Sequence, residues 1–246
     1  MNFRNQDHFC TNVMLLGYIN CESEVPAIKF LGVYLDPKLN FRFHIETIRK
    51  KISNSLYIMK AAKNILNEPA LKTLYYSMIH CHLQYCVQIW SCCNPPLLNP
   101  LILQQKKAIR LINNADYNAH TAPLFKLSKI LPLDKIAEMS KLQIIFDFSI
   151  NRLPPSFTEM WSRNYDRPGS QNLRNNGDFY VPIARLKCIE KFPKPNYPLL
   201  WNQLNSSNPE LLNLDQSKTL FNHNLKEYFL ESLELTCTRM NCPECV

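Results

Sequence analysis

The chain contains 246 residues, of which 46% are apolar and 20% are charged, a balance typical of a globular protein with a sizeable core. Only four glycines accompany 17 prolines, so the phosphate-binding patterns GxGxxG and GxxxxGKS/T are absent, which excludes Rossmann and P-loop enzymes. The net charge is +8, and no run of 18 uncharged apolar residues predicts a membrane span.

The beginning of the sequence lacks the pattern of a secretory signal. Arg4, Asp7 and His8 precede a short apolar run, and no small-residue cleavage site follows it. We therefore expect an intracellular protein, cytoplasmic or nuclear and not secreted, whose ten cysteines stay reduced. Cys81 and Cys86 lie in a strongly helical stretch and are expected to be small buried residues.

The first predicted elements are short strands followed by a long helix. Residues 13–19 and 28–35 are apolar runs with β-branched and aromatic residues, which predict a β-hairpin or two adjacent strands. Residues 36–38 form a predicted turn, and Asn40 is the expected N-cap of an amphipathic helix over 41–66. The apolar stripe of this helix contains Ile45, Ile48, Ile52, Leu56, Met59 and Leu66.

Two further helices complete a predicted antiparallel bundle over residues 41–113. Pro69 fits the first turn of the second helix, and the Pro95-Pro96 pair is expected to end it. Pro100 then opens a third helix that continues to about Asn113. The expected buried face of the second helix contains Leu71, Leu74, Tyr75, Met78, Ile79, His82, Tyr85, Cys86 and Ile89.

The remaining sequence, residues 114–246, predicts a mixed helical and irregular region. Helical signals cover residues 122–129, 134–152 and 155–163, and a last amphipathic helix covers about 216–233. Between them the chain is polar and rich in proline, with strand-like pieces around 180–186. The predicted fold class is therefore mainly α, a helical bundle preceded by a small β-hairpin.

The positive charge is concentrated in the predicted bundle. Residues 41–66 contain six basic residues and one acidic residue, and residues 67–113 contain four and one, whereas the rest of the chain is nearly balanced. Such concentration favours a surface that faces a polyanion. The alternative is a set of cations that only solvate exposed helix faces.

Seven of these cations are candidate contacts for a nucleic-acid backbone. Arg42, Arg49 and Lys60 lie within about 20° of one another on a helical wheel, which suits contact with successive phosphates of one strand. The other four candidates are Lys63, near the end of the same helix, and Lys106, Lys107 and Arg110 in one turn of the third helix.

The candidate metal ligands are weak. Cys237, Cys242 and Cys245 are spaced like zinc ligands, but a structural zinc ion needs four ligands and no fourth is evident. His80 and His82 lie two residues apart on a helix and cannot share a metal from one face. We therefore expect no metal site in this chain.

Several short sequence motifs follow one another in the order in which they occur in a known protein family. KFLGVYLD at residues 29–36 is followed by LNF at 39–41, HI at 44–45 and KI at 51–52. This succession resembles the signature that follows the palm in reverse transcriptases of non-LTR retrotransposons, the jockey- and LINE-like elements. The resemblance extends over about residues 13–246. Its further matching positions are Leu71, Leu74, Tyr75, Ile79, Leu83, Tyr85, Trp90, residues 103–110 (LQQKKAIR), 120–125 (HTAPLF), 131–133 (LPL), Trp201, Asn202, Leu204 and the three terminal cysteines.

The resemblance implies a C-terminal segment of such a polymerase. Residues 1–40 would be a residual palm β element, 41–113 a thumb-like three-helix bundle, and 114–246 a helical and irregular tail with the cysteine cluster. The family's catalytic aspartates, which hold two Mg²⁺ ions, lie upstream of the FLGV word, and this sequence has no adjacent pair of aspartates.

The expected function is therefore non-catalytic. The resemblance implies a segment that grips the template–primer backbone without sequence specificity, with no cofactor of its own and with an upstream palm as partner in a longer product. Whether any enzymatic activity resides in this chain is left open. The alternative is a helical protein-interaction or structural module, or a degenerate transposon remnant.

Overall fold

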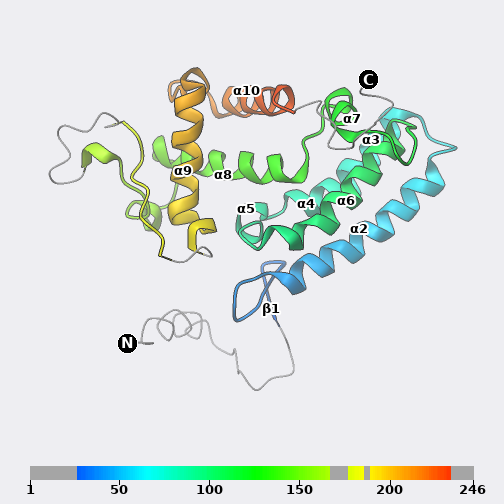
Figure 1. The fold of residues 1–246 in the computed structure, drawn as a ribbon, viewed down its shortest axis with the longest axis horizontal. Coiled ribbons are helices and arrows are strands. Elements are labelled where there is room, and N and C mark those ends of the chain that lie inside the picture. Colours follow the sequence, from blue (N-terminus) through cyan, green and yellow to red (C-terminus); the bar gives the residue numbers. More distant parts are fainter. Residues whose placement is uncertain (1–26, 167–176, 186–188, 234–246) are drawn as a thin grey trace.

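The computed structural model describes residues 27–166, 177–185 and 189–233, and these residues are mostly helical. A small antiparallel hairpin precedes the helices, as the sequence predicts. Figure 1 shows α2 and α6 in one half of the molecule and α8, α9 and α10 in the other. The elements are β1 (Ile28–Phe30), β2 (Val33–Leu35), α2 (Arg42–Ala62), α3 (Glu68–Tyr75), the π-helix η1 (Tyr76–His80), α4 (Cys81–Gln84), α5 (Val87–Trp90), α6 (Pro95–Ile112), α7 (Thr121–Ser128), α8 (Leu133–Ser149), α9 (Pro193–Ser207) and α10 (Lys218–Glu231), with 3-10 helices at Pro155–Phe157, Asn164–Asp166, Ile189–Lys191 and Pro209–Leu212.

The apolar run at residues 28–35 is itself a hairpin, whereas the sequence suggested a single strand there. The chain reverses at Leu31 and Gly32, whose φ angles are 44° and 86°. These are the two positive φ angles that a type I′ turn requires. The hydroxyl of Tyr85 donates a hydrogen bond to the Leu31 carbonyl, so the turn is tied to the helical region. The other predicted strand, residues 13–19, lies outside the described residues.

The N-cap of helix α2 lies one residue after the predicted N-cap, Asn40. Phe41 is the N-cap residue, with a φ of 58°, and makes no side-chain cap. The Asp36 carboxylate instead accepts hydrogen bonds from the backbone N–H groups of Lys38, Asn40 and Phe41, at 3.1, 3.0 and 2.7 Å. The helix ends at Ala62, four residues before the predicted end, because the last apolar residues of the run stay in solvent.

The second predicted helix is interrupted, and its buried face differs from the prediction. The π-helix η1 follows α3, and Cys86 adopts a left-handed conformation with a φ of 51° before α5. The buried residues recur every fourth position along the chain: Leu71, Tyr75, Ile79, Leu83 and Val87. The predicted core residues His82 and Cys86 are only partly buried, and Tyr85 and Ile89 are exposed. Cys81 is also exposed, so the prediction that both thiols are buried was wrong.

Prolines begin α6 earlier than predicted, and they begin another helix, α9, that was not predicted. Pro95 and Pro96 occupy the first positions of α6, where amide N–H groups have no helical partner, and Pro100 lies inside that helix. Helix α9 likewise starts at Pro193 within the region predicted to be irregular. The expected strand at 180–186 does not form in the residues described there, and a single bridge pairs Arg163 with Phe179.

A continuous apolar core joins the two halves of the molecule. Helix α2 packs along α6, α3 contacts both, and α8 packs against α5, α9 and α10. Gln105 is fully buried within this core and satisfies its whole amide. Its Nε2 donates to the Tyr75 hydroxyl at 2.8 Å and to the Leu131 carbonyl at 3.0 Å, and its Oε1 accepts from the Leu133 amide at 2.8 Å. This network fixes α6 against α3 and α8.

No helix among the described residues has both the length and the apolar character needed to cross a membrane.

Candidate nucleic-acid interface

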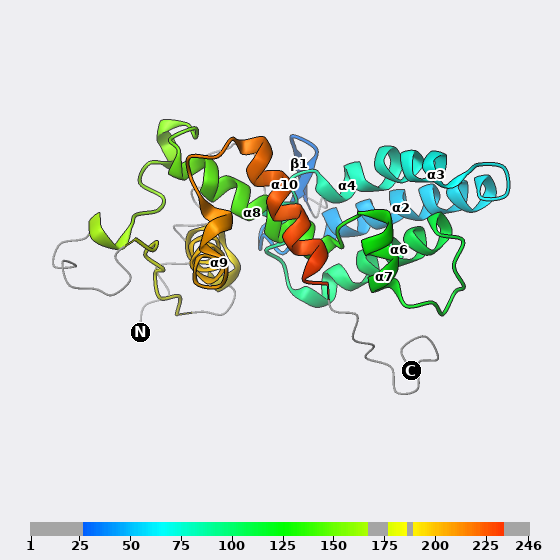
Figure 2. The ribbon, with the colours of Figure 1, turned by 90° about the horizontal axis from the view of Figure 1, so that it is seen from above.

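A groove of about 470 Å³ runs between the C-terminal halves of α2 and α6. Figure 2 shows these two helices from a second side, with the loop after α6 beside them. We call this feature the α2–α6 groove. Its lining residues are Ser53, Leu56, Tyr57 and Lys60 from α2, Gln104, Lys107, Arg110 and Leu111 from α6, and Ala115 and Tyr117 from the loop that follows.

One glutamine holds the two walls of the groove together. The Nε2 of Gln104 donates to the Ser53 hydroxyl at 2.6 Å and to the Arg49 carbonyl at 3.1 Å. Because these contacts join α6 to the middle of α2, they fix the separation of the helices where the groove lies. The walls are therefore set by the fold before any ligand binds.

The charged residues that line the groove are all basic. Lys60, Lys107 and Arg110 converge on it from two helices, and no aspartate or glutamate is among its lining residues. The apolar side chains of Leu56 and Leu111 form part of the lining between these cations. Such a surface attracts a polyanion that also offers apolar groups.

Arg110 contributes to the shape of the groove as well as to its charge. Its Nε donates a hydrogen bond of 2.9 Å to the Ala119 carbonyl, and the residue is partly buried. This contact ties the loop between α6 and α7 back to α6. Tyr117 belongs to that loop, so Arg110 helps to position it.

Two tyrosines at the groove were not among the predicted site residues. Tyr57 and Tyr117 are each 77% exposed although both line the groove. The helical wheel offered a signal for Tyr57, because it lies three residues before Lys60 and so on a neighbouring position of the same face. Tyr117 lies in a loop, where no periodicity could have placed it beside α2.

The structure separates some of the predicted cations from this groove. Arg42 lies about 27 Å from Lys60 along α2, at a rise of 1.5 Å per residue. Its Nε contacts Glu46 at 3.3 Å, and it borders a different hollow that also contains Asp36. Arg42 therefore has two carboxylates nearby, which weaken its attraction for phosphate.

The remaining predicted cations take different positions. Arg49 is exposed and adjoins the groove through its carbonyl contact with Gln104. Lys63 is the C-cap residue of α2 and is partly buried. Lys106 is partly buried and is not among the residues that line the groove. Of the seven predicted residues, the groove thus brings together Lys60, Lys107 and Arg110.

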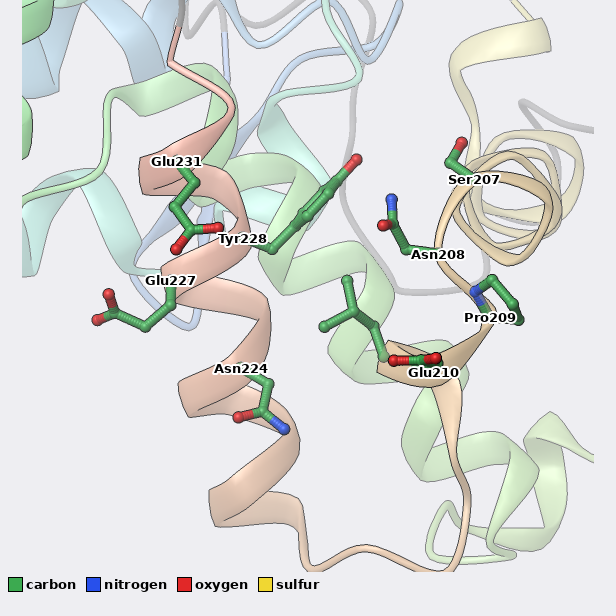
Figure 3. Close-up of a pocket in the computed structure, with 9 residues that line it drawn as sticks. Ser207, Asn208, Pro209, Glu210, Asn224, Glu227, Tyr228 and Glu231 are labelled. Atoms are coloured by element: carbon green, nitrogen blue, oxygen red, sulfur yellow. The ribbon is translucent and has the colours of Figure 1, made fainter.

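A second hollow, of about 530 Å³, has the opposite charge. It lies between the end of α9 and α10, and Figure 3 shows Glu210, Glu227 and Glu231 around it together with Tyr228. No lysine or arginine is among its lining residues. Phosphate groups would be repelled there, so the α2–α6 groove is the better candidate for an anionic ligand.

No cluster of three or more metal-ligating side chains occurs within the part of the chain that the structure describes. The predicted cysteine candidates, Cys237, Cys242 and Cys245, lie outside the described residues.

Comparison with known proteins finds similarity to two polymerases of mobile elements. The RNA-directed DNA polymerase from mobile element jockey of Drosophila funebris is 29% identical over 148 residues, and that of Drosophila melanogaster is 27% identical over 146 residues. Each match covers 57% of this chain but only 16% of the relative.

No protein-family model matches the sequence, and no solved structure matches the chain. The sequence similarity to these polymerases agrees with the motifs that resemble those of non-LTR reverse transcriptases. Over more than half of its length, the chain is similar to the RNA-directed DNA polymerases of jockey mobile elements.

Proposed function

We propose that this chain is a non-catalytic, nucleic-acid-gripping part of a retrotransposon RNA-directed DNA polymerase. The observation that carries the proposal is the convergence of Lys60, Lys107 and Arg110 on one groove without a carboxylate. The similarity to the jockey polymerases supports it, because those relatives are named for a reaction on nucleic acid.

The proposed place of the chain within such an enzyme is its C-terminal side. The hairpin would be the last part of the palm and the helices around α2 and α6 the thumb. The palm of a longer product would be the partner that supplies the catalytic aspartates and their Mg²⁺ ions. This chain would bind the nucleic acid and would not supply catalytic residues.

Binding through the α2–α6 groove should be independent of base sequence. Lysine and arginine contacts to phosphate position a nucleic acid but carry no direct information about its bases. Each neutralised phosphate releases counterions, so three contacts give a salt dependence of log K on log salt of about −2.7 for a duplex.

The test is a charge reversal of Lys60 and Lys107 together, K60E/K107E. Arg110 is kept because it also holds the loop that carries Tyr117. Anisotropy titrations at several salt concentrations should show duplex binding weakened by orders of magnitude. The slope of log K against log salt should also become flatter by about 1.8, since two contacts are lost.

The matched control is R152E/K194E, which changes the net charge equally at two exposed positions outside the groove. It should retain most of the affinity and nearly the original slope. Circular dichroism checks that both variants are folded. Equal loss in the two variants, or no loss in either, would contradict the proposal and favour a protein-interaction module.

A further inference from the structure

The α2–α6 groove combines its cations with two exposed aromatic rings. Tyr57 lies on α2 and Tyr117 in the loop after α6, so the two rings come from different segments that line one groove. Each is 77% exposed, which leaves large ring surfaces in contact with water. Exposed aromatic surface beside basic groups is a recurring feature of sites that bind unpaired bases.

The apolar lining of the groove supports the same ligand. Leu56, Leu111 and Ala115 line the groove together with the cations and offer apolar surface, which suits the sugar and base part of a nucleotide better than its phosphate. A polyanion without flat apolar groups, such as an acidic peptide or a sulfated polysaccharide, would leave this surface and both rings unused.

We infer that the α2–α6 groove takes a single-stranded segment of nucleic acid, with bases stacked on Tyr57 and Tyr117 and phosphates beside Lys60, Lys107 and Arg110. This inference rests on the proposed function and specifies its ligand. In a duplex the faces of each base are covered by neighbouring bases, so a tyrosine ring reaches them only at unpaired positions.

The experiment compares a 15-nucleotide oligouridine with a mixed-sequence RNA duplex of equal length. In the variant Y57L/Y117L the rings are lost but apolar side chains remain. Affinity for the oligouridine should fall at least tenfold, whereas affinity for the duplex should change less than twofold. The salt slope for the single strand, about −0.7 per phosphate contact, should be retained because the cations are intact.

Two controls identify stacking as the cause. Y57F/Y117F keeps both rings without their hydroxyls and should retain the oligouridine affinity of the original chain. Tyr165→Leu removes another exposed tyrosine, 60% exposed and outside the groove, and should change nothing.

The outcomes separate this inference from the proposed function. If Y57L/Y117L binds oligouridine normally while K60E/K107E does not, the groove grips phosphate without stacking, and the inference is overturned although the proposed function stands. Equal loss for strand and duplex, or equal binding of a poly-glutamate of matched charge, also overturns it. If no nucleic acid binds at any salt concentration, both are overturned.

Discussion

At the scale of single residues, His44 is the clearest case of a titratable group set by its surroundings. It is 4% exposed, and its Nδ1 accepts a hydrogen bond of 3.4 Å from the Tyr34 amide. Its ring lies 6.0 Å from that of Trp90, and its Nε2 is buried without a hydrogen-bond partner among the described residues. Burial, with a smaller contribution from Lys51, lowers the pKa of His44 to about 4.

This lowered pKa predicts a loss of stability in mild acid. Because the pKa is about 4 in the folded state and 6.5 in the unfolded chain, the unfolded state binds more protons between these values. The contribution is fully present above pH 6.5 and is lost as the pH falls towards 4. At pH 5 the free energy of unfolding should be lower than at pH 7 by about 2 kcal/mol from this residue alone.

Urea denaturation at pH 7 and pH 5 measures this difference. His44→Gln keeps a neutral acceptor for the Tyr34 amide but does not titrate, so its stability should depend less on pH by about the same 2 kcal/mol. An identical pH dependence in the variant and the original chain would show that His44 is not the responsible group.

At the scale of elements, the π-helix η1 explains where the predicted core face failed. A spacing of four residues drifts by about 40° per step around a regular α-helix, so buried residues at 71, 75, 79, 83 and 87 would wind around it. The wider turn of η1 reduces this drift and brings Leu83 onto the same helix face as Tyr75. A constant helical period would instead place His82 and Ile89 in the core, as the sequence predicted.

Deletion of Ser77 tests this account of the π-helix. Ser77 is exposed within η1, and its removal should convert the π-turn to a regular α-turn. Leu83 and Val87 would then lie seven and eleven positions after Tyr75, within about 20° of it around a regular α-helix, so both should stay in the core. We therefore expect the free energy of unfolding to fall by less than about 1 kcal/mol.

The control is Ser77→Ala, which preserves chain length and should cost less than 1 kcal/mol, as expected for an exposed side chain. The comparison uses thermal and chemical unfolding followed by circular dichroism. A deletion variant at least 3 kcal/mol less stable than Ser77→Ala would show that the buried face does not continue in phase once the extra residue is removed.

At the scale of the whole molecule, one apolar core includes both the bundle and the C-terminal region. Val33 and Ile52 belong to the same cluster as Trp201 and Phe229. Across its middle, α8 contacts α5 on one side and α9 and α10 on the other. Such continuity favours cooperative unfolding of the two halves.

The three tryptophans can report on this cooperativity. Trp90 lies within residues 41–113, whereas Trp161 and Trp201 lie in the C-terminal half, and all three are buried. Fluorescence-detected denaturation of W90F and of W161F/W201F therefore follows different halves. We expect each variant's fluorescence midpoint to coincide with its own circular dichroism midpoint. Distinct midpoints would indicate that residues 41–113 unfold as a separate unit.

The sequence predicted the helical fold class and several helix positions, but only part of the groove. Lys60 and Lys107 could be found because the positions of basic residues along a predicted helix follow directly from the sequence. Their pairing across α2 and α6 depends on the packing of those helices, and Tyr117 depends on a loop held by Arg110. Periodicity carries neither kind of information. Helix α9 was missed because its prolines, which suit a first turn, were interpreted as signs of irregular chain.

The acidic hollow at α9 and α10 has a consequence for how the molecule approaches a ligand. The acidic side chains lie at α9 and α10 and the basic groove at α2 and α6, so charges of opposite sign are exposed at different places on the described surface (Figure 1). Near a polyanion, this uneven charge favours orientations in which the basic groove faces the ligand before contact. Productive encounters should then be more frequent than for a uniformly charged protein, and added salt should reduce that advantage as the Debye length shortens.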